Sequence, residues 1–378
     1  MHIMFAPVQG RASTRRVLAL VAAVVVGGGT AMIGAAPASA SARADAMTRA
    51  TLAHLDNPYV AAKAYVNPNW AAKASAEPGG SAIANQPTGV WLDSIAAIAA
   101  PAGSGYTTSL RGHLDNALAQ SATLAQFVLY DLPSRDCQRT AHEGELGPTE
   151  IDRYRSEFID PIAAIEGDAK YSSIRIVNIV EPASLPSLIS SPSQFVDNPY
   201  RCDTMKANGN YQTGIAYALG RLHAAGTNIY NYLDAANHGW IGWNNSWDNE
   251  FAAAADLMAT VAKQATGGVS TVDGFIANLA NYGVLKEPFL TTSTTVNGTS
   301  VKQSNWVDWN GYVDESTFAK DIRVQLVTDG FNSTIGMLID TSRNGWGGPK
   351  RPTKASTSTD LNTWVDASRV DRRTAVED

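Results

Sequence analysis

The chain has few cysteines, few charged residues and no metal-ligand motif. Only two cysteines and six scattered histidines occur among its 378 residues, and neither a C-x-x-C nor an H-E-x-x-H pattern is present. The net charge of −6 comes without a basic patch, which argues against a nucleic-acid partner. A G-x-S-x-G elbow and a glycine-rich loop after a strand are also missing, so nothing indicates a serine hydrolase or a nucleotide-binding protein. We expect a monomer that holds no metal and no cofactor.

Long apolar runs are confined to the N-terminus. Residues 11–16 carry three arginines, residues 17–36 form an apolar run, and residues 38–40 (Ala-Ser-Ala) match a signal-peptidase site. The run approaches the length of a membrane span, so an uncleaved anchor is the alternative, but the small residues at its exit favour cleavage. We expect a signal peptide over 1–40 and a secreted protein without membrane association, in which 41–378 form a single domain.

The two cysteines are Cys137 and Cys202. In an exported protein two cysteines most simply form one disulfide. Such a bond ties the loop after one predicted strand to a segment beyond the next, where it can brace a site.

Aromatic residues are abundant in polar stretches. The chain has nine tryptophans and thirteen tyrosines. Aromatic rings in polar loops are typical of sugar-binding clefts, because the apolar face of a pyranose stacks on them. Ordinary structural packing is the alternative, and we expect it to explain about half of them. The tryptophans in Asn- and Gly-rich stretches are Trp240, Trp243, Trp247, Trp306, Trp309 and Trp346.

Apolar strand patterns alternate with amphipathic helix patterns. Alternation of this kind predicts an α/β fold with a mostly parallel sheet and helices outside it. The predicted strands are 125–130, 174–180 and 335–339. The predicted helices are 149–165, 211–225, 249–264 (with Ser246 as its cap) and 315–328.

Polar side chains gather directly after the predicted strands. In a β/α barrel the C-terminal ends of the strands form the active face, so a site is expected there. These residues are Asp131, Arg135, Asp136, Glu181, Asp340 and Arg343.

Three segments carry distinctive motifs: residues 130–137 (YDLPSRDC), 176–186 (IVNIVEPASLP) and 232–243 (YLDAANHGWIGW). Together they resemble glycoside hydrolase family 6, the cellobiohydrolases and endoglucanases that act on β-1,4-glucans. The first two segments are similar to the two signatures of this family, the third matches a further motif, and weaker similarity covers 274–278 and 339–345. The resemblance extends from about residue 57 to 366, nearly the whole expected mature chain.

This resemblance implies a fold and a reaction. The fold is a distorted, incomplete TIM-like β/α barrel whose long loops build a cleft or tunnel. The reaction is hydrolysis of β-1,4-glucosidic bonds of cellulose or cello-oligosaccharides with inversion. Inversion needs a protonated carboxyl group for the leaving oxygen and an ionised group that activates water on the opposite face of the sugar.

The resemblance also implies roles for five residues. Asp136 matches the aspartate that assists the acid, with a turn-capping residue as the alternative. Tyr130 matches a tyrosine against the distorted sugar. Arg135 and Arg343 match arginines that keep the active-site carboxylates ionised. Asp234 matches a further cleft aspartate, with a surface charge as the alternative.

Sugar contacts are implied for a second set of residues. Trp240 and Trp243 match the stacking platform, and Asn237 replaces a family histidine. Trp70 and Asn281 are weaker candidates, for which a structural role is an equal alternative.

The chain differs from the family at the positions of the proton donor, of a nearby serine and of the base. The proton-donor aspartate of the Glu-Pro-Asp-Ser-Leu signature is Ala183 here, and a methyl group cannot donate a proton. The serine six residues after Asp136 is His142. The segment that carries the family's base lies beyond Asp378, where the sequence ends, so we expect a domain truncated at its C-terminus. These departures predict a weak or inactive catalyst.

Three readings remain open. The first is a cellobiohydrolase-like enzyme with impaired activity, for which the loops around Trp240 and over 283–311 suggest a covered cleft. The second is a non-catalytic glucan-binding protein or inactive relic. The third is a shifted mechanism that uses His142 or Glu181; strand alternation aims Glu181 the same way as Ala183, but Pro182 and the different reach argue against it. Asp340 is expected to be a structural or electrostatic carboxylate.

Overall fold

The structure is a computed structural model. It describes residues 5–7, 53–138, 144–189, 202–245, 249–344 and 350–371. The described residues all belong to one compact unit, and residues 9–50 lie outside the described part of the chain. Of the predicted signal peptide only Phe5–Pro7 is described, so cleavage stays a prediction.

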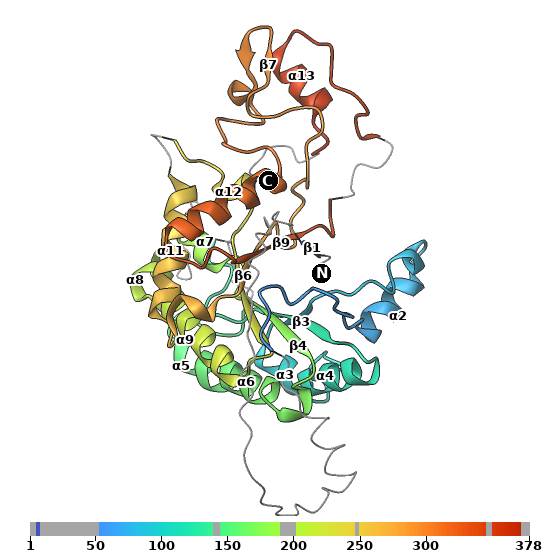
Figure 1. The fold of residues 1–378 in the computed structure, drawn as a ribbon, viewed down its shortest axis with the longest axis vertical. Helices are drawn as coiled ribbons and strands as arrows, with labels where there is room; N and C mark the ends of the chain where they lie inside the picture. Colours follow the sequence, from blue (N-terminus) through green and yellow to red (C-terminus); the bar gives the residue numbers. More distant parts are fainter. Residues whose placement is uncertain are drawn as a thin grey trace, which may run out of the picture. The chain divides into compact units, whose positions relative to one another are not determined.

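One sheet organises the described chain (Figure 1). Its neighbouring strands follow the order β1-β9-β6-β5-β4-β3-β2, and all pairs are parallel except β1 with β9. The strands are β1 (Phe5–Pro7), β2 (Val90–Leu92), β3 (Leu124–Leu129), β4 (Arg175–Val180), β5 (Ile229–Asp234), β6 (Gly274–Ala277) and β9 (Gly336–Asp340). A small separate hairpin consists of β7 (Thr295–Val296) and β8 (Thr299–Ser300).

The central strands are buried on both faces, and their alternation divides two cores. In β3, Phe127 and Leu129 contribute to the larger core, whereas Leu124 and Val128 contribute to a second cluster on the other face of the sheet. Tyr232 of β5 belongs to this second cluster. Burial on both faces is characteristic of parallel sheets in α/β proteins and explains the near-continuous apolar runs of these strands.

Helices connect the parallel strands and cover the sheet. They are α2 (Pro68–Ala76), α3 (Ile95–Ala99), α4 (Leu110–Ala119), α5 (Ile151–Arg153), α6 (Asp160–Glu166), α7 (Ser184–Ser187), α8 (Cys202–Asn208), α9 (Asn210–Ala225), α10 (His238–Ile241), α11 (Glu250–Gln264), α12 (Glu315–Thr328) and α13 (Leu361–Ser368). A π-helical stretch, Tyr154–Ile159, joins α5 to α6. Short 3-10 turns occur at Gly80–Ala82, Ala169–Tyr171, Gly268–Thr271 and Val301–Gln303.

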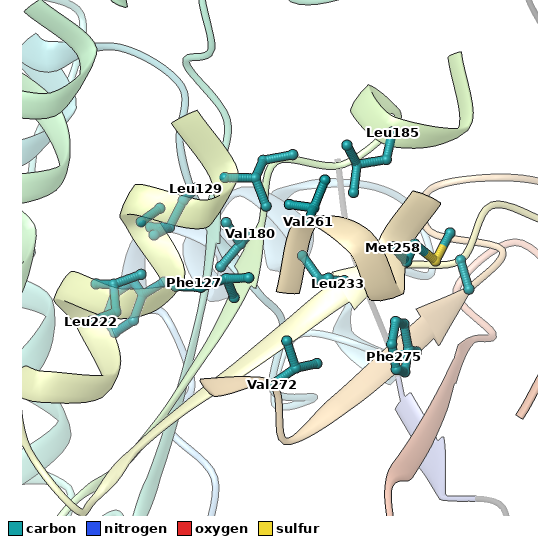
Figure 2. Close-up of a cluster of buried hydrophobic side chains, with 14 of the residues drawn as sticks. Phe127, Leu129, Val180, Leu185, Leu222, Leu233, Met258, Val261, Val272 and Phe275 are labelled. Carbon is teal, nitrogen blue, oxygen red and sulfur yellow. The ribbon is translucent and has the colours of Figure 1, made fainter. Parts of the chain in front are cut away.

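The larger core fills the space between the sheet and its helices. Figure 2 shows Phe127, Val180 and Phe275 of three strands facing Leu222 of α9 and Met258 of α11. All five side chains are fully buried. Burying a side chain of this size contributes about 1.5–3 kcal/mol each, so this layer is the main support of the strands.

The predicted elements correspond closely to observed ones. The strand predictions agree with β3, β4 and β9 to within one residue at each end, and the four helix predictions agree with α5–α6, α9, α11 and α12. α12 begins after Asp314, whose Oδ1 accepts the Thr317 N–H at 2.8 Å, a typical N-cap. Ser246, the predicted cap of α11, lies outside the described residues.

The parallel α/β prediction is therefore confirmed. Among the described residues the hydrogen-bonded sheet ends at β2 on one side and at β1 on the other. The sheet thus forms an open series of strands in this part of the chain.

Candidate active site

A cavity of about 170 Å³ lies at the carboxyl ends of the strands. Its walls come from β2 and from the turns that follow β3, β4, β5 and β6. This is the face on which β/α proteins place their chemistry. Seven residues singled out in the sequence line it, namely Tyr130, Asp136, Ala183, Asp234, Asn237, Trp240 and Asn281.

Residues in the left-handed conformation follow the strands whose turns form the cavity. Non-glycine residues with positive φ follow each of four neighbouring strands, β3 to β6. Backbone in this region is disfavoured for residues with a Cβ, and it concentrates at functional sites when the surroundings hold it in place. The residues, with φ between 51° and 61°, are Ser134, Asp136, Glu181, Ala183, Ala236, Asn278 and Ala280.

Asp234 ends β5 and holds two of these turns. Its Oδ2 accepts the Ala183 N–H at 2.8 Å and its Oδ1 accepts the Ala236 N–H at 2.9 Å. The residue is only 7% exposed, and burial raises its pKa to about 6, against the two N–H groups, which favour the ionised form. Asp234 therefore lies in the cavity as a carboxylate that fixes position 183.

Glu181 points away from the cavity, which corrects the expectation from strand alternation. β4 ends at Val180, and Glu181 already has a φ of 51°, so it does not continue the strand. Its carboxylate accepts the N–H groups of Asp131 and Leu132, each at 3.1 Å. A carboxylate engaged in this way cannot replace the missing acid at Ala183.

Asp131 and Glu181 form a buried acidic pair beneath the turn after β3. Burial, followed by the nearby Glu181 carboxylate, raises the pKa of Asp131 to about 9. Burial likewise raises the pKa of Glu181 to about 7, although the two backbone N–H groups oppose this shift. Arg135 lowers the pKa of both residues through its charge. The charge of Arg135 thus favours the ionised forms of Asp131 and Glu181, neither of which lines the cavity.

Tyr130 stands between an arginine and a tryptophan. Arg135 places its guanidinium 4.6 Å from the centre of the Tyr130 ring and donates to the carbonyls of Tyr130 and Asp93. On the cavity side the Tyr130 and Trp91 rings meet edge to face, with centroids 5.4 Å apart. Burial raises the pKa of Tyr130 well above its usual value, so it is a neutral hydroxyl here.

Trp91 is a cavity residue that the sequence analysis did not single out. It lies in β2 between buried Val90 and Leu92 and is itself partly exposed. Alternation along V-W-L places the indole on the opposite face from its neighbours, and this is the signal that could have found it.

Asp136 lies in the cavity wall and is 8% exposed. The next residue, Cys137, forms a disulfide with Cys202 at the start of α8, with Cα atoms 4.8 Å apart. The predicted disulfide is therefore present, and it ties the turn that carries Asp136 to a helix 65 residues further along the chain.

Between Asn237 and Trp240 in the sequence, His238 forms a fully buried pair with Glu315. His238 Nδ1 is 2.7 Å from Oε1 of Glu315, the first residue of α12, and both side chains are 0% exposed. Asn310 donates to the His238 carbonyl at 2.7 Å. The contact with Glu315 ties α10, which carries Trp240, to α12, and the Asn310 bond ties it to the loop before α12.

Residues 49–365 match the family model described as "Glycosyl hydrolases family 6". The chain belongs to glycosyl hydrolases family 6.

Exoglucanase A of Cellulomonas fimi is 44% identical over 342 residues, which cover 85% of this chain and 37% of that protein. The probable 1,4-beta-D-glucan cellobiohydrolase C of Aspergillus niger is 30% identical over 313 residues, which cover 79% and 60%. The chain thus spans less than two thirds of the length of these curated relatives.

Solved family 6 structures have the same fold. The catalytic domain of Cellulomonas fimi Cel6B matches with a TM-score of 0.77 at 44% identity, covering 85% of this chain and 73% of that one. A structure described as the CcCel6A catalytic domain complexed with p-nitrophenyl beta-D-cellotrioside matches with a TM-score of 0.56 at 27% identity, covering 73% and 70%. The family resemblance seen in the sequence is confirmed.

Some residues predicted from family 6 lie away from the cavity lining. Trp243 is 7% exposed, donates from its indole to the Asp308 carbonyl at 2.8 Å, and packs in a separate apolar cluster. Trp70 is on α2, and the Arg343 guanidinium lies 4.8 Å above the ring of Tyr282. The substrate and electrostatic roles of these three residues stay predictions.

Other predicted features of this family 6 chain fall outside the described residues. His142, Trp247 and Trp346 belong to that group. Within the described part of the chain, no cluster of three or more His, Cys, Asp or Glu side chains is arranged to hold a metal ion. No helix in this part combines the length and apolarity needed to cross a membrane.

A second and larger hollow, of about 410 Å³, lies at the opposite, amino ends of β6 and β9. His54 lines it, and its two ring nitrogens contact the Thr227 carbonyl (2.9 Å) and the Asp273 carboxylate (2.7 Å). Because both nitrogens are engaged, His54 is not placed as a general base. The smaller cavity at the carboxyl ends is the better candidate for the site.

Proposed function

We propose that the chain is a secreted, single-domain glycoside hydrolase that cleaves β-1,4-glucosidic bonds of cellulose with inversion, in the manner of a cellobiohydrolase. The observation that carries the proposal is the cavity itself, whose lining combines the aromatic rings of Trp91, Tyr130 and Trp240 with the carboxylates of Asp136 and Asp234. Aromatic faces suit pyranose rings, and carboxylates suit both sugar hydroxyls and proton transfer. The names of the relatives, an exoglucanase and a cellobiohydrolase, support the same substrate class.

We further propose that the activity of this chain is impaired. The position of the family's proton donor is Ala183, which lines the cavity with a methyl group. Asp234 is occupied by the N–H groups of Ala183 and Ala236, and Glu181 is turned toward Asp131. Loss of a general acid costs a factor of about 10²–10⁴ in rate.

A non-catalytic glucan-binding protein is the second candidate. It is favoured by the same Ala183, because the aromatic walls of the cavity remain while the proton donor is absent. Binding without turnover separates the two functions.

The test is to measure binding and cleavage separately. Calorimetric titration with cellohexaose, with xylohexaose as the control ligand, measures affinity, and chromatography of released cello-oligosaccharides measures turnover. We expect binding that prefers cellohexaose, together with slow release of cellobiose. Binding with no release at all supports the glucan-binding function, and absence of cellohexaose binding refutes both.

The stereochemistry of the products tests the proposed inversion. Proton NMR of the first products should show the α-anomer at the new reducing end. A β-anomer overturns inversion and indicates a different arrangement of groups.

A further inference from the structure

Carboxylates at the ends of three strands hold the turn that follows the neighbouring strand. Glu181, after β4, accepts N–H groups from the turn after β3. Asp234, the last residue of β5, accepts the Ala183 N–H from the turn after β4. Asp340, the last residue of β9, accepts the Ala280 N–H from the turn after β6 at 2.7 Å. The same arrangement therefore recurs at the carboxyl ends of β4, β5 and β9.

Asp234 and Asp340 share the details of this arrangement. Each binds the N–H two residues further along its own chain with Oδ1, at 2.9 Å in both cases, namely that of Ala236 or Ser342. Each binds the N–H of a left-handed alanine on the neighbouring turn with Oδ2. Asp340 is thus the counterpart of Asp234 two strands further along the sheet.

The turn held by Asp340 forms part of the cavity wall. Ala280, with a φ of 56°, and Asn281 both line the cavity. The Asn281 side-chain oxygen accepts the Tyr282 N–H at 2.6 Å, so its amide is oriented by the same turn. Fully buried Asn278 donates to the Asp340 carbonyl at 2.8 Å.

We propose that Asp340 is a positioning residue for the glucan site, which holds the Ala280 turn in its left-handed conformation so that Asn281 faces the sugar. The side chain of Asp340 is 0% exposed and is separated from the cavity by the turn that it binds, so it acts through Asn281 rather than by touching substrate. The proposal rests on the proposed glucan function. It assigns to a strand-end carboxylate a role in binding in place of a general structural role.

The test is a double-mutant cycle on cellohexaose affinity. Asp340→Asn keeps the size of the side chain but offers one oxygen and one NH₂ group, so either Ala280 or Ser342 loses its acceptor. We expect cellohexaose to bind about tenfold more weakly to this variant. In an Asn281→Ala background the same substitution should change the affinity less than about twofold. Asp152→Asn, which removes a carboxylate that is 94% exposed, is the matched control and should bind like the unchanged protein.

The cycle separates positioning from general support. Unchanged affinity of Asp340→Asn overturns the proposal. An equal loss with and without Asn281 also overturns it, because Asp340 then does not act through that residue. If the unchanged chain does not bind cellohexaose, the proposed function has failed. The role of Asp340 is then tested separately, by measuring whether it holds the Ala280 turn.

Hydrogen exchange of the unchanged protein supplies that second test and needs no variant. The Ala280 N–H lies outside every helix and strand, yet it is bound to a buried carboxylate. We expect this amide to exchange at least about 10³-fold more slowly than an unprotected amide. Exchange at the rate of an open loop would show that Asp340 does not hold the turn, and would overturn the proposal.

Discussion

Replacing Glu166 by glutamine should stabilise the protein at neutral pH. Glu166 ends α6, is 1% exposed, and its Oε2 accepts the Asn178 amide of β4 at 2.7 Å. Among the described residues, neither its Oε1 nor the Asn178 Oδ1 has a hydrogen-bond partner. Burial raises the pKa of Glu166 from its ordinary value of 4.5 to about 8, because a lone carboxylate between helix and sheet is poorly solvated.

The sign of the effect follows from this raised pKa. Between pH 4.5 and 8 the folded protein keeps a proton on Glu166 that the unfolded chain releases, so the free energy of unfolding falls as the pH rises through this window. At pH 7 the penalty is on the order of 3 kcal/mol, since each pH unit above 4.5 contributes about 1.4 kcal/mol. Glutamine has the same shape and no charge, so Glu166→Gln removes the penalty.

Urea unfolding of both proteins between pH 4 and pH 8 measures the difference. We expect the variant to match the unchanged protein near pH 4 and to exceed it by about 2–3 kcal/mol at pH 7. Glu157→Gln, at a side chain that is 46% exposed, is the control and should show no such trend. A difference that does not change with pH, or a variant that is less stable at pH 7, would refute the reasoning.

Three further predictions concern the supports of the cavity. Removing the disulfide as C137A/C202A should lower the free energy of unfolding by about 4 kcal/mol, because the bond closes a loop of 65 residues; a loss under about 1 kcal/mol in urea unfolding contradicts this. His238→Ala should cost about 3–5 kcal/mol in the same assay, because the buried Glu315 carboxylate loses its imidazole partner; unchanged stability rules out a supporting pair. Trp240→Ala should weaken cellohexaose binding roughly tenfold in calorimetry; equal affinity would show that its ring is not a sugar platform.

Much of the sheet could be predicted because its strands are buried on both faces. The segments that form β3 (L-A-Q-F-V-L) and β4 (R-I-V-N-I-V) are mostly apolar, and every residue in them is buried, including the polar Gln126 and Asn178. β5 was not predicted as a strand, since only two residues of its sequence I-Y-N-Y-L-D are aliphatic, against four in β4. Its Asn231 is buried and donates to the Thr271 carbonyl at 3.0 Å, a partner 40 residues away that local pattern does not reveal.

Part of the cavity lining could be predicted from the sequence, but the backbone conformation of its turns could not. Motif matching brought Tyr130, Asp136, Asp234 and Trp240 together, and all of them line the cavity. Alternation failed at Glu181, because a left-handed residue directly after β4 turns the side chain away. Positive φ at residues other than glycine has no strong sequence signal, since it is imposed by bonds to the neighbouring strand.

The central claim is that Ala183, at the position of the family's proton donor, limits the chemistry of the cavity. Ala183 already has a φ of 59°, a conformation that aspartate and asparagine adopt more readily than most residues, so Ala183→Asp and Ala183→Asn should both be accepted by the backbone. The decisive measurement is time-resolved product release from cellohexaose by the unchanged chain and these two variants. We predict that Ala183→Asp is at least about 100-fold faster than the other two, because it alone can donate a proton. An unchanged chain that cleaves as fast as Ala183→Asp, or a gain that Ala183→Asn shares, would contradict the account.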